Sequence, residues 1–153
     1  MIKLNKMIAS DYDKYIKIAI PDYAEDKIKS GAWKKEEALK LSEQTFLEGL
    51  PERQETENEF LFCISLENET IGYVWFHFND KESTTAFIYD FLILKEYQNQ
   101  GYGSKAMSCI EEVAHEAGAK KLGLHVFAHN KRAVHVYEKS GFEFTDFSMT
   151  KDL

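Results

Sequence analysis

A glycine-containing turn at residues 97–104 is the feature that most constrains the fold of this chain. It follows an apolar run at residues 86–94 and leads into a segment with helical periodicity. A strand that ends in such a turn and continues as a helix directs several backbone N–H groups at one place, where an anion can bind. The sequence therefore predicts a phosphate-binding loop within an α/β fold.

Hydrophobic periodicity predicts one mixed α/β (α+β) domain over residues 1–153, with helices on both faces of one sheet. The predicted strands are residues 2–7, 59–66, 71–78, 86–94, 121–127 and 142–149. The predicted helices are residues 11–20, 23–29, 35–50, 104–117 and 131–139, and Pro21 separates the first two. Because a helix connects strands 86–94 and 121–127, these two strands are expected to run parallel.

Charge and composition exclude several functional classes. The net charge is −7 and the pI about 5.3, with no basic stripe for a phosphate backbone, so nucleic acid is not an expected partner. The negative charge gives weak support to a cationic substrate. No apolar stretch is long enough to span a membrane and no apolar leader is present, which favours a cytoplasmic protein. Cys63 and Cys109 lack metal-ligand spacing, so no metal is expected.

Two familiar phosphate loops fit the turn poorly. The Walker loop ends in G-K-[ST], whereas Gly103 is followed by Ser104 and then Lys105. The dinucleotide fingerprint G-x-G-x-x-A matches residues 101–106. It also requires an acidic residue at the end of the next strand, and residues 123–126 contain none. A nicotinamide dinucleotide site therefore stays only as an alternative.

A third pattern, Q/R-x-x-G-x-G/A, fits residues 98–103, and residues 130–142 fit N-x-x-A-x-x-x-Y-x-x-x-G-F. Together these blocks resemble the two signatures of the GNAT (GCN5-related N-acetyltransferase) superfamily, over about residues 85–145. Within it, the chain is similar to small bacterial acetyltransferases of unassigned substrate. The resemblance implies the acyl-CoA N-acyltransferase fold, which has a mostly antiparallel sheet and a splayed parallel strand pair at the CoA site. It also implies acetyl-CoA, or coenzyme A, as co-substrate.

The same resemblance assigns roles to particular residues. Asn130 both caps the following helix and hydrogen-bonds the coenzyme, and Tyr137 is the general acid that protonates the departing thiolate. The main chain of the preceding strand pairs with the pantetheine arm, through Leu92, Ile93 and Leu94. Amides of the loop hold the pyrophosphate, namely those of Gln98, Asn99, Gln100, Gly101, Tyr102, Gly103 and Ser104.

The general base is left open between two residues. A primary ammonium with a pKa of about 10.4 must lose a proton before it can attack a thioester. His125 and Asp90 are the candidates, and a structural hydrogen bond is an equally open role for each. The other histidines are expected to be surface or packing residues: His77, His115, His129 and His135. Residues between the first helices are candidates for the acceptor pocket or for ordinary capping and packing: Asp22, Tyr23, Glu25 and Trp33.

The function predicted from these patterns is direct transfer of an acetyl group from acetyl-CoA to a primary amine of a small molecule or peptide. The reaction is expected to proceed through a ternary complex, without an acyl-enzyme. A non-catalytic CoA-binding module of the same fold is the alternative. A homodimer, which is common for this fold, is also allowed by the resemblance.

Overall fold

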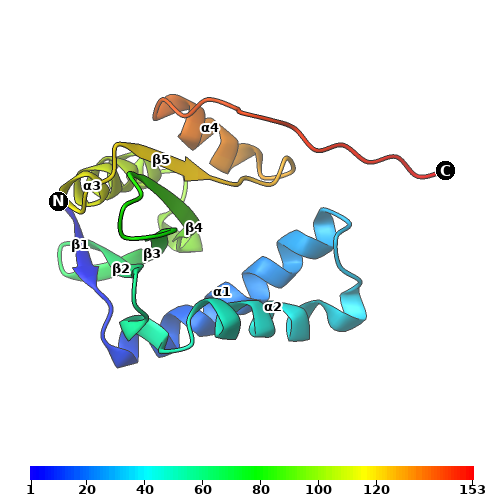
Figure 1. The fold of residues 1–153 in the computed structure, drawn as a ribbon, viewed down its shortest axis with the longest axis horizontal. Helices are drawn as coiled ribbons and strands as arrows, with labels where there is room; N and C mark the ends of the chain where they lie inside the picture. The colour runs from blue at the N-terminus through cyan, green and yellow to red at the C-terminus, as the bar shows by residue number, and fades with distance from the viewer.

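The computed structural model describes residues 1–153 and contains a five-stranded sheet in the order β1-β2-β3-β4-β5 (Figure 1). The strands are β1 (Ile2–Lys6), β2 (Glu59–Leu66), β3 (Glu69–Phe78), β4 (Thr85–Ile93) and β5 (Lys121–Leu124). The helices are α1 (Ala9–Lys29), α2 (Lys35–Gly49), α3 (Tyr102–Glu116) and α4 (Lys131–Lys139), with short 3₁₀ turns η1 (Arg53–Glu55) and η2 (Lys95–Tyr97). Neighbouring strands are antiparallel except β4 and β5, which confirms the predicted mixed sheet and its parallel pair.

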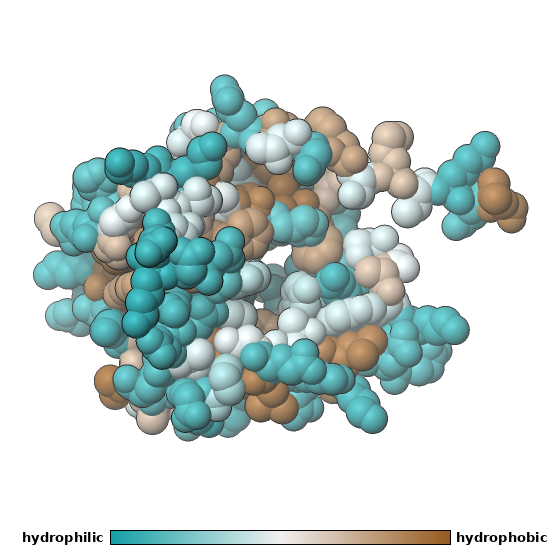
Figure 2. Space-filling model, viewed as in Figure 1, coloured by the Kyte–Doolittle hydropathy of each residue, from teal (hydrophilic) through white to brown (hydrophobic).

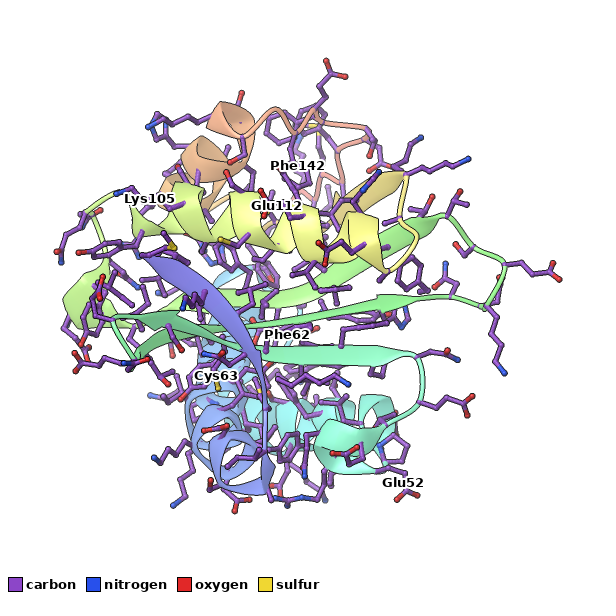
Figure 3. The ribbon with its side chains drawn as sticks, turned by 90° about the vertical axis from the view of Figure 1, so that its left-hand side faces the viewer. Glu52, Phe62, Cys63, Lys105, Glu112 and Phe142 are labelled. Carbon is purple, nitrogen blue, oxygen red and sulfur yellow. The ribbon has the colours of Figure 1, made fainter.

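Alternation of side chains along the middle of β2 builds a core on each face of the sheet. Phe62 and Ile64 of β2 belong to the core under α3, whereas Leu61 and Cys63 belong to the core under α1 and α2. In Figure 3, α3 lies above the sheet and α1 with α2 below it, and Cys63 lies on the α1 side. Both faces of the sheet are therefore covered, as its near-continuous apolar strands require.

β4 and β5 pair over only part of their length. The parallel register runs from Thr85 opposite Lys121 to Ile88 opposite Leu124, and β5 ends there. β4 continues to Ile93, still paired with β3 but with no strand on its outer edge. The predicted strand 121–127 was therefore too long, and its early end opens the sheet at this edge.

The separation predicted at Pro21 is wrong, because α1 runs through this residue as one helix. Its buried positions Tyr12, Tyr15, Ala19 and Ala24 keep helical spacing across the proline. A proline inside a helix costs about 3 kcal/mol because it removes a hydrogen bond and crowds the preceding turn. Packing of this continuous face against the sheet and α2 outweighs that cost, and the Ser42 hydroxyl of α2 donates to the Ile20 carbonyl at 2.7 Å.

The strand predicted at residues 142–149 is also wrong. Phe142 donates its amide to the Tyr137 carbonyl at 3.0 Å, and the chain beyond it forms neither helix nor strand. Figure 1 shows this segment leading away from the sheet. Its alternating apolar side chains, including Phe147 and Met149, are largely exposed. The alternation is typical of a strand, but a strand needs a neighbouring edge, and no edge of this sheet receives it.

Candidate active site

The loop after β4 presents a group of free backbone donors. Gly101 adopts a left-handed conformation (φ 83°) and is the N-cap of α3, and Asn99 is also left-handed (φ 62°). None of the amides of residues 99–104 donates a hydrogen bond to another group of the chain. Free donors at a helix N-terminus fit a phosphate or pyrophosphate, so the loop can hold the diphosphate of a nucleotide-derived coenzyme.

Gln98 shapes the loop instead of offering a free amide to the pyrophosphate. Its amide donates to the Lys95 carbonyl at 3.2 Å, so this amide is already satisfied. Its side-chain Nε2 donates to the Ile93 carbonyl at 2.8 Å, which ties the loop to the end of β4. Gln100 similarly donates from Nε2 to the Glu96 carbonyl at 3.0 Å. Both glutamine side chains therefore shape the loop.

The outer edge of β4 near its end exposes main-chain groups. The Leu94 amide donates to the Ile71 carbonyl at 2.8 Å, so it points toward β3. Successive residues of a strand direct their N–H groups to opposite edges, so the Ile93 amide faces the open side. The side chains of Leu92 and Leu94 pack against the α1-side core, and that of Ile93 packs against the α3-side core. The Ile93 amide is therefore the main-chain donor of this segment that is free for a ligand, because the Ile93 carbonyl already accepts from Gln98.

A β-bulge in β4 decides where Asp90 points. Trp75 pairs with Asp90 and Phe76 with Ile88, so Tyr89 is the extra residue. Without the bulge, alternation would place Asp90 on the same face as Ile88, in the α3-side core. With it, Tyr89 and Asp90 both line one pocket on the α1 side.

This pocket has a volume of about 480 Å³ and lies between the sheet and the first two helices. Its walls come from five elements, α1, α2, β2, β3 and β4: Tyr23, Thr45, Phe46, Glu48, Gly49, Glu59, Trp75, His77, Tyr89 and Asp90. Figure 2 also shows a hollow between the α1–α2 layer and the part formed by β5 and α4, but no residue of β5 or α4 lines the pocket. The volume is in the range of small-molecule sites.

Asp90 is the most perturbed acid in the pocket. The buried Tyr15 hydroxyl donates to its Oδ2 at 2.6 Å. Burial, assisted by the charges of Asp22 and Asp26 and opposed by the hydrogen bond from Tyr15, raises the pKa of Asp90 to about 7. Burial beside this carboxylate also raises the pKa of Tyr15 well above its usual value, so its proton stays on the phenol. Asp90 can therefore exchange a proton near neutral pH.

A second carboxylate forms a network across β2 and β3. Glu59 accepts hydrogen bonds from Trp75 Nε1 at 3.1 Å and pairs with His77 Nδ1 at 2.9 Å. The other ring nitrogen of His77 lies 3.1 Å from Asn79 Oδ1. Burial raises the pKa of Glu59, while the neighbouring His77 lowers it. His77 was expected to be a surface or packing residue, but it lines the pocket.

Tyr137 lies on α4, and Asn130 is the N-cap of the same helix. The Tyr137 ring centroid is 6.2 Å from that of Phe91 on β4. Burial raises the pKa of Tyr137 far above its ordinary value, and the charge of Asp90 adds to the shift, so its hydroxyl can donate but does not ionise. Asn130 accepts a hydrogen bond from the Ala133 amide at 3.3 Å, which confirms it as the helix cap.

The structure does not bring His125 to the pocket. It lies beyond the end of β5, is exposed, and packs edge-on against Phe127 at 5.0 Å. Tyr23 lines the pocket, and the ring of Trp33 packs against the ring of Tyr23 with the centroids 5.5 Å apart. Asp22 and Glu25 do not line the pocket. No helix is long and apolar enough to cross a bilayer, and no group of His, Cys, Asp or Glu forms a metal site.

Sequence reasoning missed Tyr15, Glu59 and Trp75. Each sits in an apolar or amphipathic run and looked like part of a core or a strand end. The cross-strand pairing of Glu59 with His77 was available as a signal once the hairpin was predicted, because residues facing each other on adjacent strands interact. Nothing local pointed to Tyr15, whose partner is 75 positions away.

Comparisons with known proteins identify the family. The model of the acetyltransferase (GNAT) family matches residues 22–142. YycN of Bacillus subtilis (strain 168), an uncharacterized N-acetyltransferase, is 38% identical over 154 residues, which cover 99% of each protein. YdgE of the same organism, also an uncharacterized N-acetyltransferase, is 31% identical over 152 residues, covering 98% of this chain and 97% of YdgE.

Solved structures lead to the same family. The crystal structure of YycN superposes with a TM-score of 0.96 at 37% identity, covering 100% of this chain and 99% of that one. The PaiA N-acetyltransferase of Thermoplasma acidophilum, in complex with coenzyme A, shares the fold with a TM-score of 0.73 at 16% identity, covering 97% and 93%. The chain therefore belongs to the GNAT family and is an acetyl-CoA-dependent N-acetyltransferase.

Proposed function

We propose that the protein transfers the acetyl group of acetyl-CoA directly to a primary amine bound in the pocket beside Asp90. One observation carries the proposal: β4 contributes to both sites. Asp90 of this strand lines the pocket, and the open edge and the loop with free amides lie at the end of the same strand. Ile93, with its amide on the open edge, is three positions from Asp90, which lines the pocket. Donor and acceptor can therefore bind on either side of the end of β4 at the same time.

The donor is held chiefly by main-chain groups. The free amides of residues 99–104 bind the pyrophosphate, and within residues 92–94 the open edge of β4 at Ile93 aligns the pantetheine arm, since Leu92 and Leu94 direct their amides toward β3. The side-chain amide of Asn130 keeps its NH₂ group for the coenzyme, because only its oxygen is used as the helix cap. The Ile93 amide is the donor for the thioester oxygen, where negative charge develops during attack.

Asp90 is the proposed base. Moving a proton from an ammonium of pKa about 10.4 to an ordinary aspartate of pKa about 3.9 costs about 9 kcal/mol. Because the pKa of Asp90 is raised to about 7, the same transfer costs about 5 kcal/mol. The neutral amine then forms the new C–N bond as the C–S bond breaks. His125 is exposed and outside the pocket, so the geometry favours Asp90 over it.

Tyr137 is proposed to donate a hydrogen bond to the departing sulfur. A phenol of ordinary pKa about 10 is already a weaker acid than a thiol of about 8.5, and burial weakens it further. Stabilising the thiolate by a charge-assisted hydrogen bond is therefore easier than complete proton transfer. The nitrogen loses its remaining extra proton as the amide forms, and the thiolate takes up one proton, so that free coenzyme A leaves.

The cysteines support direct transfer. Burial raises the pKa of the Cys63 thiol to about 12, and Cys109 donates to the Ile2 carbonyl at 3.7 Å. Neither lines the pocket. A thiol held in its neutral form is a poor nucleophile, so the chain offers no cysteine that would carry the acetyl group.

The test combines binding and turnover. Isothermal calorimetry should detect acetyl-CoA and CoA at millimolar concentration or below, and free-thiol release should follow when primary amines are added. Binding of CoA without thiol release for any amine would favour the non-catalytic module. A thermal shift with NADH but none with acetyl-CoA would instead favour the dinucleotide alternative.

A further inference from the structure

We infer that the pocket selects an acceptor that carries a second positive charge in addition to the reactive amine and that lacks a carboxylate. This inference rests on the proposed function and narrows its acceptor. It follows from the charges, the aromatic rings and the strand register of the pocket, each of which acts on a different part of the ligand.

The charged groups in the pocket wall are nearly all acidic. Glu48, Glu59 and Asp90 line it, and no lysine or arginine does. The one basic side chain, His77, is already paired with Glu59. A ligand carboxylate would therefore find no cation to bind and would be repelled by its neighbours, whereas an ammonium group finds acceptors.

Aromatic rings cover the rest of the wall. The centroids of Trp75 and Tyr89 are 4.9 Å apart, those of Phe46 and Trp75 are 5.7 Å apart, and those of Tyr23 and Phe46 are 6.0 Å apart. Such a surface packs against an alkyl chain and attracts cations through the ring faces. Lys27 Nζ, which does not line the pocket, already lies 5.5 Å from the centroid of Tyr23.

The sheet register separates two acidic positions. Asp90 lies opposite Trp75 on one side of β3, and Glu59 lies opposite His77 on the other side. Their strands are therefore two spacings apart, about 10 Å across the sheet, and the Glu59 side chain reaches toward the Trp75 indole. With the reactive amine at Asp90, a short alkyl chain over Trp75 brings the second ammonium to Glu59 and to the open Glu48 at the rim.

The first experiment measures binding with a series matched in length. Calorimetry at pH 7.5, on the full chain with excess CoA, compares 1,4-diaminobutane, butylamine and 4-aminobutanoate. We expect the diamine to bind at least tenfold more tightly than butylamine, and 4-aminobutanoate more weakly than either. Equal binding of the diamine and butylamine, tighter binding of 4-aminobutanoate, or no binding of the diamine would each overturn the inference.

Charge-neutralising variants then locate the second ammonium. Glu59→Gln and Glu48→Gln should each reduce the preference for the diamine over butylamine by threefold or more. Glu48 is exposed, so its replacement does not endanger folding. Glu43→Gln, an exposed change on the same helix outside the pocket, is the matched control and should leave the preference unchanged. An unaltered preference in both pocket variants would overturn the inference.

Thiol release with the same amines separates this inference from the proposed function. Tight, selective binding of the diamine without thiol release would contradict acetyl transfer and leave the selectivity intact. Thiol release with every amine at equal kcat/KM would support acetyl transfer and overturn the selectivity.

Discussion

The proposed donor and acceptor sites of this protein are built on different principles. The loop after β4, the proposed donor site, offers backbone amides of six consecutive positions, 99–104, placed by left-handed residues and the start of α3. The pocket, the proposed acceptor site, is lined by side chains from α1, α2, β3 and β4 together with Glu59 of β2. A contiguous backbone motif can be read along the chain, whereas a pocket assembled from distant elements cannot.

Asp90→Asn should cause the largest loss. Removal of a general base typically lowers turnover by roughly 10²- to 10⁴-fold, and we expect kcat to fall within that range while the Kd for CoA changes little. Steady-state thiol release and calorimetry provide the two measurements. In the wild type, kcat/KM should rise with pH through about 7, because Asp90 must be ionised to accept a proton.

Tyr15→Phe is the matched control for that profile. It removes the hydrogen bond that lowers the pKa of Asp90 but keeps the carboxylate. The activity profile should therefore move to higher pH with a modest loss at its plateau. A profile that does not move in Tyr15→Phe, or persists in Asp90→Asn, would exclude Asp90 as the base.

Ionisation of Asp90 should lower the free energy of unfolding at high pH. The folded protein keeps the Asp90 proton up to about pH 7, whereas the unfolded chain releases it near pH 3.9. The native state therefore binds more protons in this window, and its stability falls as the pH rises. Asp90→Asn should raise the free energy of unfolding at pH 8 by at most about 4 kcal/mol and leave it unchanged below pH 4. Urea unfolding at both pH values measures the difference.

Tyr137→Phe tests the leaving-group contact. A hydrogen bond to a charged group contributes about 1.5–3 kcal/mol, which corresponds to roughly a tenfold to hundredfold loss in kcat. The Kd for CoA should stay within about twofold, since the hydroxyl acts on charge that develops during the reaction. Turnover equal to the wild type would remove Tyr137 from the mechanism.

The loop glycines should differ from one another. Gly101 has a φ of 83°, so Gly101→Ala should destabilise the fold by about 1 kcal/mol and weaken CoA binding by displacing the amides. A Cβ at Gly103 would meet Val136 at an ordinary 3.6 Å, so Gly103→Ala should be nearly neutral for stability. Thermal unfolding and calorimetry compare them, and equal effects would contradict a backbone cradle set by the left-handed residue.

Phe147→Ser should have the smallest effect. This side chain is 77% exposed, in the segment that joins no sheet. The free energy of unfolding should change by less than about 0.5 kcal/mol, as for other exposed positions. A larger loss that depends on protein concentration would show that the segment pairs with a second copy of the chain.

Where a signal is local, sequence reasoning placed it well. The helix predicted at residues 131–139 and the strand at 59–66 have the predicted bounds, because a capping asparagine and a run of apolar residues mark them. The loop was found for the same reason. Errors arose where the rest of the fold decided: packing keeps α1 helical through Pro21, and the segment after Phe142 has no strand edge to join.

Residue patterns along the chain were enough to predict the elements from β2 to α4, the loop that presents free amides, and the family to which the chain belongs. These follow from spacing along the chain, since glycines, a cap and apolar periodicity act on their neighbours. Only the tertiary structure decided that Asp90 faces the pocket, that Tyr15 binds it, and that Glu59 joins Trp75 and His77. The physical reason is that one extra residue in β4 reverses the face of every side chain after it, and burial there moves a carboxylate pKa to about 7.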